Sequence, residues 1–122
     1  MSNVTDMYGM FANSVFNRDI SEWDVSKVTN MTYMFSKSDF NGDICSWNVS
    51  NVTNMYCMFY RSVFNRDISE WNVSSVTDMG YMFSDSKFNR DISKWDVSHV
   101  RYKDYIFSNC HIKEKYKPKF KK

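Results

Sequence analysis

The chain has 122 residues, the size of one domain, and carries a formal net charge of +2 at pH 7. Its three Gly and one Pro exclude long flexible linkers, and its three Cys, which do not recur, exclude a disulfide framework. No apolar stretch reaches the length that a membrane-spanning helix needs. Aromatic residues make up 18% of the chain, and nearly all recur at fixed intervals, so we interpret them as core residues.

A repeat organises the chain. Its register is marked by Val4, Val28, Val52, Val76 and Val100, which are 24 residues apart. In the first four units, Met, Met-Phe and Phe-Asn follow at constant offsets, and each unit closes on Asp-Ile, Trp and Val-Ser. The fifth unit decays after Val100. One such unit cannot bury its own apolar face, so we expect the units to stack.

The first half of each unit predicts a short helix. In the second unit, the apolar residues have offsets of 0, 3, 6 and 7, which places them on one helical face. These residues are Val28, Met31, Met34 and Phe35. Thr29 is a suitable N-cap for this helix, and Thr5, Thr53 and Thr77 are its equivalents.

The second half of each unit predicts one short strand. Trp23, Asp24 and Val25 alternate between apolar and polar, and the helix would supply the crossover that parallel strands need. The Asn and Asp of the intervening turn are suited to binding backbone groups. We therefore expect two ladders that join unit to unit. They comprise Asn17, Asn41, Asn65 and Asn89, and Asp19, Asp43, Asp67 and Asp91.

The string Val-Thr-Asn-Met-x-x-Met-Phe, followed by Phe-Asn-x-Asp-Ile-Ser-x-Trp-Asn-Val-Ser, resembles the BspA-like leucine-rich repeat. That repeat belongs to mycoplasma-type surface lipoproteins and to paralogous families of large DNA viruses. The resemblance covers residues 4 to about 110 and implies a right-handed solenoid. We predict an α/β, leucine-rich-repeat-like solenoid over residues 1–110, with four 24-residue strand-plus-helix coils and a degenerate fifth. A basic C-terminal tail, residues 111–122, follows.

Polar residues that alternate with the buried positions of the strand form a candidate binding face. Its members are Glu22, Asp24, Ser46, Asn48, Glu70, Asn72, Lys94 and Asp96. Repeat proteins commonly bind partners on such extended surfaces. The alternative is a face that is only solvated.

The tail carries a charge opposite to that of the body. Residues 111–122 hold six Lys and one Glu, whereas residues 1–110 hold ten Lys or Arg and thirteen Asp or Glu. The candidate electrostatic residues are Lys113, Lys115, Lys117, Lys119, Lys121 and Lys122. Such a tail is suited to an acidic partner, nucleic acid or a membrane surface, and the alternative is a solvated terminus.

No catalytic constellation or cofactor motif is present, so we expect neither an enzyme nor a bound cofactor. The Asp ladder is a candidate calcium-binding site. The neighbouring Arg18, Arg66 and Arg90 indicate instead that the Asp charges are balanced by arginine. His99 occupies a variable position and is interpreted as a solvated turn residue.

The leading functional hypothesis is a non-enzymatic scaffold for protein–protein interaction, as a virion or host-interaction component. A protein partner, or a second subunit, would contact the open edge of the first coil. One alternative is a secreted or surface adhesin, which the bacterial members of the resembling family imply. The other is contact of the tail with nucleic acid or membranes, which we favour less. Because no signal peptide precedes the first repeat, an intracellular or virion location is favoured over secretion.

Overall fold

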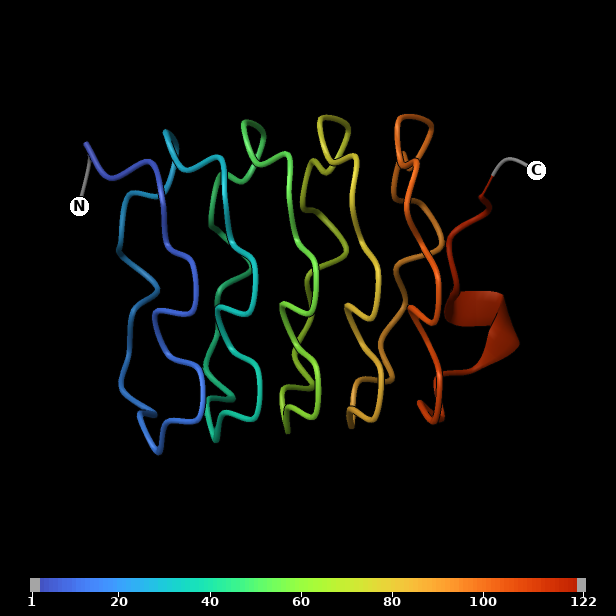
Figure 1. The fold of residues 1–122 in the computed structure, drawn as a ribbon, viewed down its shortest axis with the longest axis horizontal. Helices are drawn as coiled ribbons and strands as arrows, with labels where there is room; N and C mark the ends of the chain where they lie inside the picture. Colours follow the sequence, from blue (N-terminus) through green and yellow to red (C-terminus); the bar gives the residue numbers. More distant parts are fainter. Residues whose placement is uncertain (1–2, 121–122) are drawn as a thin grey trace.

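The computed structural model describes residues 3–120. Over these residues the chain forms coils that stack along one axis from the N-terminal to the C-terminal end (Figure 1). Isolated parallel bridges join successive coils at equivalent positions of the repeat. The bridged residues are Asp6, Asn30, Asn54, Asp78 and Tyr102, one from each of five coils. We number these coils 1 to 5, with starts at residues 4, 28, 52, 76 and 100.

Each coil has two legs, between which the core lies. We call the first the ladder leg, because its backbone pairs with the neighbouring coils; it covers residues 5–14 in coil 1. The return leg follows and covers residues 16–26 in coil 1. Equivalent residues in later coils are obtained by adding multiples of 24. The two legs lie one behind the other in Figure 1.

The predicted α/β architecture of strand-plus-helix coils is wrong. Among residues 3–120 the only helix is the 3-10 helix η1 (Glu114–Tyr116), and no strand or sheet is formed there. The segment predicted as a helix is a run of tight turns. The segment predicted as a strand, residues 23–25, lies between two turns and makes no strand pairing.

The ladder leg of coil 2 explains why no helix forms. The Met34 amide donates to the Met31 carbonyl at 3.2 Å, which closes a turn whose third residue, Tyr33, has a φ of 59°. A second turn ends at Ser38 and has Lys37, with a φ of 54°, as its third residue. A positive φ at the third position is what a type II turn requires, and it interrupts a right-handed helix.

Four alternate amides of the ladder leg bond to the next coil. In coil 2, alternate amides donate to carbonyls of coil 3 at 2.8–3.0 Å. The donors are Met31, Tyr33, Phe35 and Lys37, and their acceptors are, in the same order, the carbonyls of Asn54, Tyr56, Met58 and Tyr60. A helix would satisfy such amides within one coil, whereas these pair between coils as in a parallel sheet. Met31, Met34 and Phe35 are nevertheless fully buried, so their spacing is compatible with a turn run as well as with a helix.

Two phenylalanine columns fill the core. Neighbouring rings are 5.5–5.8 Å apart in one column and 6.3–6.4 Å apart in the other. The first column contains Phe11, Phe35, Phe59, Phe83 and Phe107, and the second contains Phe16, Phe40, Phe64 and Phe88. Within a coil the two rings stack at 4.3–4.7 Å. Stacking therefore runs both along and across the coils, with the ring separations that aromatic pairs prefer.

The tryptophans join return legs to one another. Trp47 donates its indole N–H to the Ile20 carbonyl of the preceding coil at 3.0 Å. Trp71 and Trp95 repeat this bond to Ile44 and Ile68 at the same distance. Each of the three rings is at least 95% buried, so the bond satisfies a polar atom that burial would otherwise leave without a partner.

The threonines that were predicted to cap helices also act between coils. The Thr29 hydroxyl lies 3.2 Å from the Thr5 carbonyl and donates to it. Thr53 and Thr77 make the equivalent bond at 3.3 Å. The predicted N-cap role is therefore wrong, because no helix begins at these residues.

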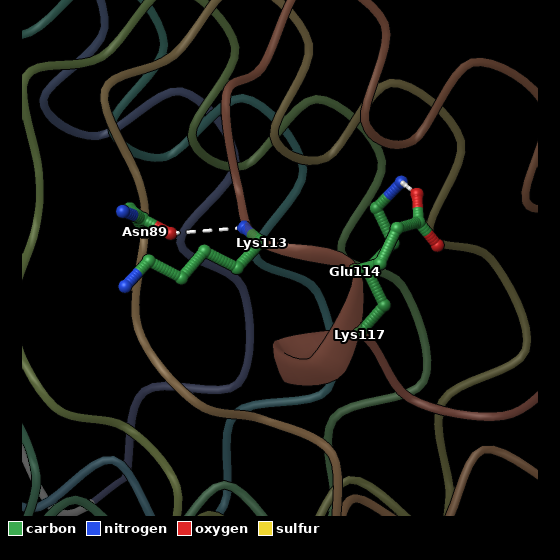
Figure 2. A network of polar contacts seen from close by, with 4 residues as sticks. All are labelled: Asn89, Lys113, Glu114 and Lys117. Atoms are coloured by element: carbon green, nitrogen blue, oxygen red, sulfur yellow. Dashed lines mark hydrogen bonds and ion pairs between the residues drawn. The ribbon is translucent and has the colours of Figure 1, made fainter.

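The predicted Asn ladder is confirmed. Each Asn side-chain oxygen accepts the backbone amide of the equivalent residue in the next coil at 2.8–3.1 Å. The last step runs from Asn89 to the Lys113 amide at 3.0 Å (Figure 2). The Asp ladder does not act in this way, because each carboxylate accepts the amide two residues later in its own coil at 2.9–3.0 Å. The Asp residues therefore stabilise turns within coils, not contacts between them.

We expect Asn65→Ala to lower the free energy of unfolding by about 1–3 kcal/mol, because the Asn89 amide loses its acceptor. Asn65→Asp keeps an acceptor oxygen and should lose less. Urea unfolding of both variants beside the wild type measures the difference. Equal losses would show that the bond between coils contributes nothing.

The C-terminal residues continue the repeat register. Ile112 takes the position that Phe88 holds in coil 4 and is 6% exposed. The Tyr116 carbonyl, in η1, accepts the Ile92 amide at 2.9 Å, and Pro118 is buried. Part of the predicted tail thus packs against coil 4 at the end of the stack (Figure 1).

Candidate functional site

All eight residues of the predicted binding face are exposed, and they lie on the return legs of coils 1 to 4. The buried residues between them are Trp47, Trp71 and Trp95. The face therefore has the alternation of buried and exposed positions that the sequence predicted, although the backbone is not a strand.

Four of these eight residues stabilise the backbone. The side-chain oxygens of Asp24, Asn48, Asn72 and Asp96 each accept the amide two residues later at 3.0 Å. This local bond is an Asx turn, which Asp and Asn form readily. The side chains that differ most in charge from coil to coil are the other four. They are Glu22, Ser46, Glu70 and Lys94.

Glu70 and Lys94 border an open hollow of about 490 Å³ where the return legs of coils 3 and 4 approach η1. The hollow is lined by side chains of both charge signs and by the half-buried Tyr116. Its remaining lining residues are Asn65, Asp67, Ser69, Asn89, Arg90 and Asp91. The hollow therefore joins the predicted face to the first part of the predicted tail.

Two carboxylates in this hollow, Asp67 and Asp91, have a lowered pKa and are held in their charged form. Hydrogen bonds from the Ser93 side chain and amide lower the pKa of Asp91, and the nearby charges of Lys94 and Lys115 act in the same direction. The pKa of Asp67 is lowered by hydrogen bonds from the Ser69 amide and side chain. The hollow thus keeps fixed negative charges beside its cations.

Because these Asp pKa values lie below the ordinary value of 3.8 in the folded chain, the stability they contribute is complete above that pH. It is lost as the pH falls through the folded-state pKa values. We expect the melting temperature to fall on acidification below about pH 4. In the double variant Asp67→Asn/Asp91→Asn, the amide oxygens still accept but do not titrate, so the fall should be smaller. An unchanged acid dependence in this variant would contradict the assignment.

The predicted electrostatic tail is partly used for packing. Lys117 forms an ion pair with Glu114 at 2.6 Å, shown in Figure 2, and its ammonium lies 5.3 Å from the Phe107 ring centroid. Lys113, Lys115 and Lys119 are exposed. The ammonium groups of the first two lie 5.5 and 5.8 Å from the Tyr116 ring centroid. Lys121 and Lys122 lie outside the described residues.

Within residues 3–120, no three His, Cys, Asp or Glu side chains are grouped in a way that could hold a metal ion. Arg66 and Arg90 help to lower the pKa of Asp43 and Asp67, after the hydrogen bonds that dominate. The exposed His99 places its Nδ1 atom 2.9 Å from the Ser74 carbonyl oxygen.

Sequence reasoning missed a row of tyrosines on the ladder legs. Neighbouring rings in this row have centroids 5.2–6.0 Å apart. The row contains Tyr8, Tyr33, Tyr56, Tyr81 and Tyr105. Tyr60 joins it beside Tyr81. The signal in the sequence was weak, because these tyrosines alternate between two repeat positions and resemble the buried aromatic residues beside them.

Among residues 3–120, no helix combines the length and the apolar character needed to cross a bilayer.

Comparison with curated proteins and with solved structures gives no match. A family model described as "Mycoplasma protein of unknown function, DUF285" matches twice, over residues 1–63 and 60–117. The match agrees with the mycoplasma part of the predicted resemblance but does not identify a leucine-rich repeat. Because the two matches cover nearly the whole chain, the protein belongs to this DUF285 family.

Proposed function

We propose that the chain is a non-enzymatic scaffold that binds a protein partner on the return legs of coils 3 and 4. The observation that supports this proposal is the open hollow bordered by Glu70 and Lys94. Ladders of hydrogen bonds hold the surrounding coils on both legs, so the surface is rigid before a partner arrives. Preorganisation of this kind reduces the entropy cost of binding.

The charges of the hollow favour a partner with charged groups of both signs. Arg90 and Lys94 lie beside Asp67, Glu70 and Asp91 in the lining. Mixed charges at fixed positions give specificity, because a partner with the wrong arrangement meets like charges. Tyr116 supplies an aromatic contact of the type that contributes strongly to interfaces.

The test is capture of partners from the native source by the wild type and by the double variant Glu70→Lys/Lys94→Glu. We expect the variant to lose the main captured protein. The control is Asp39→Lys/Lys87→Glu, which reverses two exposed charges outside this hollow and also leaves the net charge unchanged. Retention of the partner by the first variant, or its loss in the control, would overturn the proposal. The identity of the captured protein separates an adhesin from a virion component.

A second candidate function is electrostatic contact of the C-terminal residues with nucleic acid or a membrane surface. Exposed ammonium groups at Lys113, Lys115 and Lys119 favour it. Because residues 112–118 pack on the fold, deletion of the tail would disturb coil 4, and substitution of the three lysines by Gln is the better test. We expect binding to DNA or to anionic vesicles to weaken with salt and with this substitution. Binding that is unchanged by the substitution would exclude this function for the lysines.

A further inference from the structure

The row of tyrosines defines a second surface, on the ladder legs, which we call the tyrosine face. At its N-terminal end the face is hollowed by about 570 Å³. The lining residues are Tyr8, Gly9, Ala12, Asn13, Tyr33, Ser36, Lys37 and Tyr60. The hollow exists because coil 1 has Gly9 at the repeat position where coils 2, 4 and 5 carry a tyrosine. No atom lies within 4 Å of the place that a Cβ on Gly9 would occupy.

The opposite end of the tyrosine face projects. Tyr105, in coil 5, occupies the same repeat position as Gly9, and 64% of it is exposed. It stands beside Tyr81, with ring centroids 5.2 Å apart. The tyrosine face therefore has a hollow at its N-terminal end and an exposed ring at its C-terminal end. Both lie at the same repeat position of the ladder leg.

A two-fold axis brings these two ends together. When the axis lies along the ladder leg of coil 3, in the plane of contact, coil 1 of one copy faces coil 5 of the other. Each residue then faces the same repeat position of the opposite coil. Gly9 and its hollow come to face Tyr105 of the second copy, and this contact occurs twice.

The charges on one flank of the face agree with this arrangement. The flank consists of exposed residues at one repeat position: Asn13, Lys37, Arg61, Asp85 and Asn109. The two-fold axis places Lys37 opposite Asp85 of the second copy, and Asp85 opposite Lys37. Asn109 donates to the Asp85 carboxylate at 3.0 Å and so helps to orient it. A two-fold axis along the stack would instead set coil 2 against coil 2 and reverse the ladder legs, so Lys37 would not meet Asp85.

We propose that two copies of this chain associate face to face and antiparallel through the tyrosine face, with Tyr105 of each copy seated in the hollow at Gly9 of the other. Burial of tyrosine rings supplies the driving force, and tyrosine is among the residues enriched at interfaces. Five coils at a spacing of roughly 4.8 Å make a short contact, so the dimer is of the weak, concentration-dependent class.

One contact opposes association. Arg61 lies on the axis and faces Arg61 of the second copy, while its guanidinium lies 5.4 Å from its own Tyr60 ring centroid. Removal of this charge should therefore strengthen the dimer. The tyrosine face is on the legs opposite to the hollow of the proposed function, so either proposal can fail without the other.

The first test is sedimentation equilibrium of the full chain over a range of concentrations. We expect the mass to rise from 14.6 kDa toward 29.2 kDa, twice the mass of the chain, and to stop there. Lys37→Asp and Asp85→Lys should each weaken association by about tenfold, and the double variant should restore it. Arg61→Gln should tighten it. A strict monomer, growth beyond the dimer, or a double variant as weak as the singles would overturn the proposal.

The second test exchanges the projection and the cavity. Gly9→Tyr fills the hollow and Tyr105→Gly removes the ring, so each should abolish the dimer. Both sites have a φ of 61°, which glycine accepts, and tyrosine already adopts a φ of 55–61° at this position in coils 2, 4 and 5. The double variant should recover association, and circular dichroism would show that each variant keeps its fold. Dimers that persist in both single variants would exclude this contact.

Discussion

Phe59→Ala is expected to lower the free energy of unfolding by about 3–5 kcal/mol. Phe59 is fully buried at the centre of the longer phenylalanine column. Its ring stacks on Phe35 at 5.6 Å and on Phe83 at 5.5 Å, and on Phe64 of its own coil at 4.6 Å. Truncation leaves a cavity, which the coils on either side cannot close because their backbones are held in place by hydrogen bonds. Urea unfolding monitored by tryptophan fluorescence measures the loss.

The matched control is Phe11→Ala, at the first position of the same column. Phe11 is 9% exposed and has one neighbour in its column, Phe35 at 5.7 Å. We expect a smaller loss there, because fewer contacts are removed and coil 1 can relax. A loss equal to or greater than that of Phe59→Ala would contradict the account of the core as a continuous stack.

The second large effect is expected at an exposed side chain. Arg61→Pro should destabilise the chain by about 3 kcal/mol or more, chiefly through the backbone. Arg61 has a φ of 57°, which the proline ring forbids, and its amide donates to the Ser84 carbonyl of coil 4 at 2.9 Å. Thermal and urea unfolding of the variant test this expectation.

Arg61→Gly provides the comparison at the same residue. Glycine accepts the positive φ and keeps the amide donor, so the strain of the left-handed conformation is relieved. Loss of the contact between Arg61 and the Tyr60 ring, and the greater freedom of the unfolded chain, offset part of that gain. We expect a net change within about 1 kcal/mol. If the Pro and Gly variants lost the same stability, the left-handed turn would not be the cause.

The sequence predicts the repeat register and the buried positions well. Val28, Met31 and Trp47 are buried, as their recurrence indicated, and the Asn ladder forms. The helix prediction was wrong because apolar residues at offsets of 0, 3, 6 and 7 also fit turns of four residues placed end to end. The distinguishing signal was the residue type at the left-handed positions. Gly9 and Asn13 suit a positive φ, but Tyr33 and Lys37 at the equivalent positions conceal it.

The candidate surfaces differ in how far the sequence predicts them. Exposure of Glu70 and Lys94 follows from their alternation with buried residues, so the face could be located from sequence. The hollow could not, because it depends on Tyr116, whose chain segment was expected to be a separate tail. The tyrosine face could not be predicted from the sequence alone either. Tyr8 and Tyr33 are 25 residues apart and meet only because the coils stack, with ring centroids 5.7 Å apart.

The ladder bonds have a consequence for how such a gene can change. The ladder-leg amides that donate to the following coil meet a carbonyl at the same repeat position in each of coils 1 to 4. Removal of residues 52–75 would join Asn51 to Val76, which would then take the place of Val52. Unequal crossing-over between the near-identical copies can therefore add or delete whole coils without breaking a column. The number of coils is consequently a quantity that recombination can vary in single steps, while the ends of the stack stay the same.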